Sequence, residues 1–82
     1  MKPARTWGHI VAGRRDIRFR DFEQLLAAFG FEFDRQSGSH WIYRHPALRL
    51  RMNIQPEGGR AKHYQIRQLL DLVETHGLRL RE

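Results

Sequence analysis

A histidine directly after a Gly-Ser turn is the feature of this sequence best suited to chemistry. The turn is Gly38-Ser39, and His40 opens the strand-like run that follows it. A neutral imidazole at that position could act as a general base towards a nearby hydroxyl group. Gly38 would let the backbone of another molecule approach closely. The competing interpretation is an ordinary turn-to-strand junction whose histidine is structural or simply exposed, and the residues alone leave both interpretations open.

Arginines surround this histidine in the sequence. A guanidinium presents a planar fork of donors that suits phosphate oxygens, and it can hold the charge that builds on phosphorus during attack by a hydroxyl. With His40 as the base, the attacking group could be the 2′-hydroxyl of RNA. The alternative is the polar side of an exposed sheet. The four candidate RNA-binding residues are Arg35, Arg44, Arg49 and Arg51.

The net charge of the chain also favours a nucleic-acid ligand. The 82 residues carry a formal net charge of +6, and only Lys2 and Lys62 are lysines, so the excess is nearly all arginine. A small basic domain of this kind is often a nucleic-acid binder. A solvated arginine-rich surface and an acidic protein partner remain open. Trp41 and Tyr43 could stack on RNA bases if exposed, but burial is expected for at least one of them.

Several other classes of site lack support. The chain has no cysteine, and no tight cluster of metal-ligating residues, so neither a metal nor a cofactor is expected. His40 and His45 differ by an odd number, so an ideal strand would point them to opposite faces. No apolar run is long enough to span a membrane and no secretory signal is recognisable, which favours a cytoplasmic protein. The scattered histidines are His9, His40, His45, His63 and His76.

Hydrophobic periodicity predicts the elements that must position His40. An apolar stripe over residues 20–30 predicts a helix that ends at Gly30, and a second stripe predicts a helix over residues 62–76. Between them the period changes to two, which predicts three strands near residues 31–34, 41–43 and 49–54. Arg49 and Arg51 are assigned to the third strand.

Short connections between these strands favour an antiparallel meander. The predicted fold class is therefore α+β, a two-layer αβββα domain in which two helices cover one face of a three-stranded antiparallel sheet. Residues 1–16 are interpreted as an N-terminal appendage with a short helix, and residues 17–82 as a single domain.

Several motifs carry a resemblance to a known family. The helix end Gly30-Phe31, the turn Gly38-Ser39-His40 and the run Ile42-Tyr43-Arg44-His45-Pro46 are similar to those of HicA toxins. The segments Asn53-Ile54-Gln55 and Ala61-Lys62-His63-Tyr64-Gln65-Ile66-Arg67 resemble one branch of that family. The similarity covers roughly residues 17–78.

The resemblance implies a fold like that of a double-stranded-RNA-binding domain, and ribonuclease activity on mRNA that blocks translation. It maps the family's catalytic histidine onto His40, with Gly38 and Ser39 as the turn that positions it. The implied partners are mRNA and a HicB-type antitoxin, and any operator DNA would be bound only through the antitoxin. We therefore expect a metal-independent endoribonuclease of a type II toxin–antitoxin pair. A non-enzymatic RNA-binding module and a degenerate antitoxin-binding protein are the alternatives.

Overall fold

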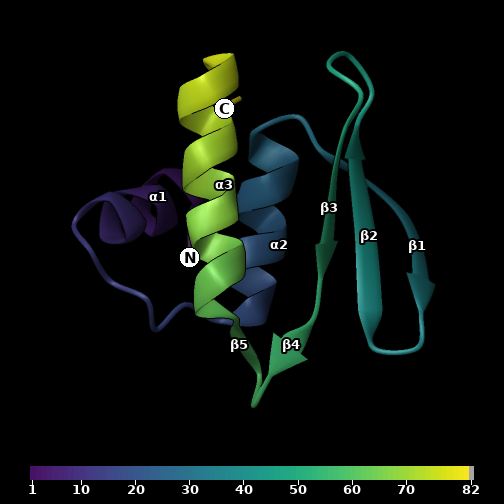
Figure 1. Cartoon of the computed structure of the whole chain (residues 1–82). Helices are drawn as coiled ribbons and strands as arrows, with labels where there is room; N and C mark the ends of the chain where they lie inside the picture. Colours follow the sequence, from purple (N-terminus) through teal and green to yellow (C-terminus); the bar gives the residue numbers. More distant parts are fainter. Residues whose placement is uncertain (82) are drawn as a thin grey trace.

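Helices and a small antiparallel sheet build the chain in a computed structural model, which describes residues 1–81 (Figure 1). The helices are α1 (Pro3–Val11), α2 (Phe19–Ala28) and α3 (His63–His76). The main strands are β1 (Glu32–Ser37), β2 (His40–His45) and β3 (Leu50–Ile54), and a short hairpin follows with β4 (Pro56–Glu57) and β5 (Arg60–Ala61). The α+β class and the order α2-β1-β2-β3-α3 confirm the predicted αβββα arrangement.

The three main strands form one antiparallel sheet in the order β1-β2-β3. Arg44 on β2 lies opposite Arg51 on β3, and Ser37 lies opposite His40 across the β1–β2 hairpin. A register shift between Phe33 and Arg35 leaves an irregularity in the edge strand β1. Because side chains alternate along a strand, this register determines which residues share a face.

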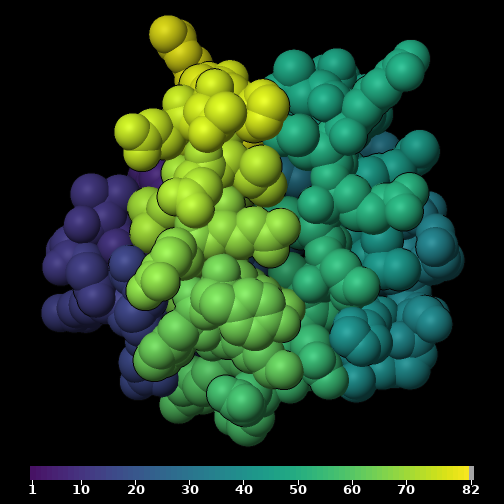
Figure 2. All heavy atoms as spheres, viewed as in Figure 1, coloured from purple at the N-terminus to yellow at the C-terminus, as the bar shows by residue number. Residues whose placement is uncertain are grey.

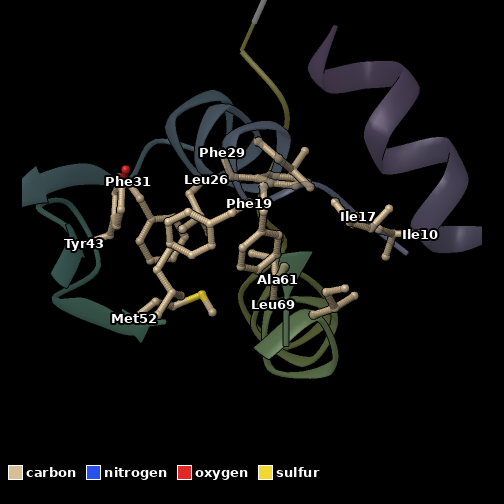
Figure 3. Packing of buried hydrophobic residues seen from close by; sticks show 14 residues of the cluster. Ile10, Ile17, Phe19, Leu26, Phe29, Phe31, Tyr43, Met52, Ala61 and Leu69 are labelled. Carbon is tan, nitrogen blue, oxygen red and sulfur yellow. The ribbon is translucent and has the colours of Figure 1, made fainter. Parts of the chain in front are cut away.

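Helices α2 and α3 lie on one side of this sheet (Figure 1). The apolar stripe of α2 is fully buried there, with Phe22, Leu25 and Leu26 each 0% exposed. Met52 from β3 and Leu69 from α3 join the same cluster (Figure 3). Ile54 on β3 and Ile66 on α3 also belong to it. At about 1.5–3 kcal/mol for each large apolar side chain buried, this cluster dominates the stabilisation of the fold.

The N-terminal helix α1 joins the helical layer on the side away from the sheet (Figures 1 and 3). Ile10 is 1% exposed and belongs to the core cluster. The ring of Trp7 meets Phe29 edge-on with centroids 4.9 Å apart. The segment interpreted as an appendage thus contributes a third helix to the layer, and the division of the chain at residue 16 stays a prediction.

Gly30 follows α2 at a position that strongly favours glycine. Its φ is 98°, and a Cβ built there would lie 2.7 Å from Nε2 of His45. His45 is only 5% exposed, and its ring packs edge-on against Phe31 at 5.3 Å. His45 therefore belongs to the packed, helix-covered side of the sheet.

Candidate active site on the open face of the sheet

The sheet face turned away from the helices carries most of the predicted site residues, and we call it the open face. Strand alternation and the register assign its members. They are Glu32, Arg35 and Ser37 on β1, His40, Ile42 and Arg44 on β2, and Arg51 and Asn53 on β3. All of them except Ile42 are exposed. The odd spacing of His40 and His45 does point the two rings to opposite faces, as expected.

A two-residue turn delivers His40 to this face. Gly38 has a φ of 60°, whereas Ser39 has no positive φ, which is the pattern of a type II′ hairpin turn with glycine first. A Cβ built on Gly38 would meet no atom within 4 Å, so the space beside the turn is open. The imidazole of His40 is exposed at the start of β2. A large ligand can therefore reach the ring without any movement of the backbone.

One side chain holds the His40 ring. Nδ1 of His40 lies 3.0 Å from Oδ1 of Asn53. Asn53 pairs with Ile42 in the sheet, so it is the diagonal neighbour of His40 on the same face. Asn53 was not among the site residues expected from the sequence. Its alternation with Met52 and Ile54 was the signal that would have placed it on the open face.

Hydrogen bonds between polar side chains connect the Gly38-Ser39 turn to the residue before α3. The side-chain amide of Gln55 donates to Oγ of Ser39 at 2.8 Å, and Nζ of Lys62 donates to Oε1 of Gln55 at 3.0 Å. Lys62 thus brings a cation to the His40 end of the sheet from the residue that precedes α3. Neither Gln55 nor Lys62 was expected from the sequence, because their proximity depends on how the β4–β5 hairpin returns the chain.

The predicted arginines are distributed along the open face and its far end. Arg44 and Arg51 are direct cross-strand neighbours, and Arg35 lies opposite Ile42 on the same face while pairing with Asp34 at 2.6 Å. His40 and Arg44 are four positions apart in β2, which is about 13 Å along an extended strand. A bound polyanion would therefore have to extend along β2 to meet both.

The assignment of Arg49 to the third strand was wrong. Arg49 lies in the turn before β3 with a φ of 54°, because the chain needs a left-handed residue to reverse direction between β2 and β3. It still lines one shallow pocket with Arg44 and Arg51. The turn therefore keeps the Arg49 guanidinium near the basic end of the sheet.

The aromatic residues of β2 face the helices instead of the open face. Tyr43 is 6% exposed and its hydroxyl donates to Oε2 of Glu23 at 2.6 Å, so one of the two aromatics is buried as expected. Burial, together with this hydrogen bond to a carboxylate, raises the pKa of Tyr43 well above its usual range. Trp41 is half-buried between Phe19 and Phe33. Neither ring is available for stacking on a ligand bound to the open face.

Residues 1–81, the described part of the chain, show neither a metal-binding cluster nor a membrane-spanning helix. In this part of the chain no group of three or more histidine, cysteine or acidic residues is close enough to hold a metal ion. None of the helices described there is long and apolar enough to cross a membrane.

Comparison with known proteins identifies the family. No curated protein matches the chain, and no solved structure does. A family model described as "HicA toxin of bacterial toxin-antitoxin" matches residues 19–75, which span α2, the whole sheet and most of α3. The match includes His40, Asn53 and all four predicted arginines, and it leaves out α1. The chain therefore belongs to the HicA toxin family of bacterial toxin–antitoxin systems.

Proposed function

We propose that this protein is a cytoplasmic endoribonuclease toxin that cleaves mRNA without a metal ion, with His40 as its catalytic base. The observation that carries the proposal is the exposed imidazole, held at Nδ1 by Asn53, on a face that also presents three arginines. Membership of a toxin family supports the same reading.

The proposed reaction uses the ring nitrogen that Asn53 leaves free. Nε2 of His40 removes the proton from a ribose 2′-hydroxyl, and the resulting oxygen attacks the adjacent phosphorus. The new P–O2′ bond forms as the P–O5′ bond breaks, which leaves a 2′,3′-cyclic phosphate and a 5′-hydroxyl end. Guanidinium groups stabilise the charge that develops on the phosphate oxygens.

The leaving 5′ oxygen needs a proton from a second group. His45 and His63 are the candidates from the sequence, and the burial of His45 on the helix-covered side of the sheet argues against it. His63 is exposed at the first residue of α3, directly after Lys62, and stays a candidate for the proton donor. Lys62 itself would add positive charge beside the turn.

We further propose that a HicB-type antitoxin inhibits the toxin by covering the open face. An acidic or apolar segment of the partner would meet the arginines and bury His40, so that RNA and antitoxin compete for one surface. Any contact with operator DNA is proposed to run through the antitoxin. Such occlusion would let a cell carry the toxin gene without harm.

Cleavage assays with and without the antitoxin test this function. We expect the purified chain to cut mRNA, and an equimolar amount of the small protein encoded beside it to stop the reaction, more effectively at low salt. Hydrogen exchange of the complex should show protection within residues 35–54. Protection confined to the helices would contradict occlusion, and RNA binding without any cleavage would leave only a binding module.

A further inference from the structure

We infer that Asn53 is the positioning residue of the site: it fixes the tautomer of His40 so that Nε2 is the base. This inference rests on the proposed function and deepens it. An amide oxygen can only accept a hydrogen bond, so the 3.0 Å contact with Oδ1 of Asn53 requires a proton on Nδ1 of His40. The lone pair then lies on Nε2, because a neutral imidazole has one donor and one acceptor.

The position of Asn53 is itself fixed by a buried side chain. Gln65 on α3 is 1% exposed and donates from its amide to the backbone carbonyl of Asn53 at 3.1 Å. Its oxygen accepts from the backbone N–H of Gln55 at 3.3 Å. One buried amide thus clamps the end of β3 on both sides of Ile54. Burying a polar group is costly unless it is hydrogen-bonded, and here the hydrogen bonds of Gln65 hold the backbone at Asn53 in place.

Gln65 also connects the two residues that hydrogen-bond to Ser39 and His40. Asn53 contacts the ring of His40, while Gln55, held by the same Gln65, donates to the hydroxyl of Ser39. The neighbouring charged groups are Arg35 on β1 and Lys62 before α3, and both are kept in every variant below. An amide at position 53 orients the ring without adding a negative charge beside a site for a phosphate.

Two variants at position 53 separate a role in orienting the His40 ring from a role in the stability of the fold. Asn53→Ala removes the acceptor, and Asn53→Asp keeps an acceptor but adds a charge. For Asn53→Ala we expect kcat for RNA cleavage to fall about 10- to 100-fold, the range typical of partners that orient a functional imidazole, with little change in KM. For Asn53→Asp we expect the acid limb of the pH–rate profile to move upward by about 1 pH unit, because a nearby carboxylate favours the imidazolium.

The decisive readout is the tautomer, measured by nitrogen NMR on protein labelled in its imidazole rings. The parent should show His40 protonated on Nδ1 in its neutral form, and Asn53→Ala should shift the population towards Nε2–H. Gln68→Ala, which removes an exposed amide on α3, is the matched control and should change neither the spectrum nor kcat. Since Asn53 is exposed, thermal unfolding of Asn53→Ala should stay close to that of the parent.

The results that would refute the positioning role of Asn53 differ from the result that would refute the proposed function. A parent His40 in the Nε2–H form, or an Asn53→Ala variant with unchanged tautomer or unchanged kcat, would overturn the positioning role. A parent protein that cuts no RNA would refute the proposed function itself, whatever tautomer its histidine adopts.

Discussion

His40→Ala is expected to lower the rate of RNA cleavage by about 10²- to 10⁴-fold, the usual contribution of a general acid–base group. This loss corresponds to about 2.7–5.4 kcal/mol of transition-state stabilisation. The exposed ring lies beside open space, so its removal should shift the free energy of unfolding by only about ±0.5 kcal/mol. The variant should also keep its affinity for RNA and for the antitoxin, and it should be harmless when expressed.

Cleavage rate and thermal unfolding should be measured on the same purified His40→Ala sample. His76→Ala is the matched control, because it removes an exposed imidazole from the last turn of α3, at the opposite end of the molecule from the β1–β2 turn (Figure 1). The control should cleave at the parent rate. A well-folded His40→Ala that also cleaves at the parent rate would reduce His40 to a turn residue.

Replacing Arg44 and Arg51 together by Ala is expected to cause the largest loss of RNA affinity. These residues are cross-strand neighbours on the open face, so both can contact one stretch of phosphates. Each neutralised phosphate contributes about −0.7 to the slope of log affinity against log salt on single strands. Losing two contacts should therefore flatten the slope by about 1.4 and weaken binding about 25-fold at 0.1 M salt.

The control for this pair must remove the same formal charge from the helical side. Arg5 on α1 and Arg67 on α3 are both exposed, and Figure 2 shows α1 on the left and α3 down the middle of the molecule, with β1 and β2 on the right. Arg5→Ala with Arg67→Ala should leave the salt slope nearly unchanged. A slope that flattens in this control, and stays constant when Arg44 and Arg51 are replaced, would place the RNA-binding surface on the helices.

The fold could be predicted because local signals agreed with the tertiary structure. The stripe of α2 and the alternation of Leu50, Met52 and Ile54 each have one periodicity, and burial follows it closely. The N-terminal helix was harder to place, because Ile10 and Trp7 are too few to indicate whether a helix packs on a core. Its contact with Phe29 depends on a loop that brings distant residues together.

The candidate site could be predicted only in part. His40 was selected from its turn, and the alternation of the third strand was sufficient to place Arg51 on the polar face. Arg35 reaches that face only through the register shift between Phe33 and Arg35, which the period of the first strand does not predict. Asn53, Gln55 and Lys62 were missed because hydrogen bonds between side chains depend on register and on the return of the chain through β4 and β5. Arg49 was misplaced because nothing in its neighbours shows that the turn requires a positive φ there.

The most direct test of the central claim is the chemistry of the RNA ends produced in excess EDTA. The purified chain should cut a defined RNA under these conditions and leave 2′,3′-cyclic phosphate and 5′-hydroxyl ends, detectable by mass spectrometry. Replacing the ribose at the cleavage site by deoxyribose should block the cut, since the attacking hydroxyl is then absent. Cleavage that stops in EDTA and returns with Mg²⁺ or Mn²⁺, or that leaves 3′-hydroxyl and 5′-phosphate ends, would contradict a metal-independent mechanism centred on His40.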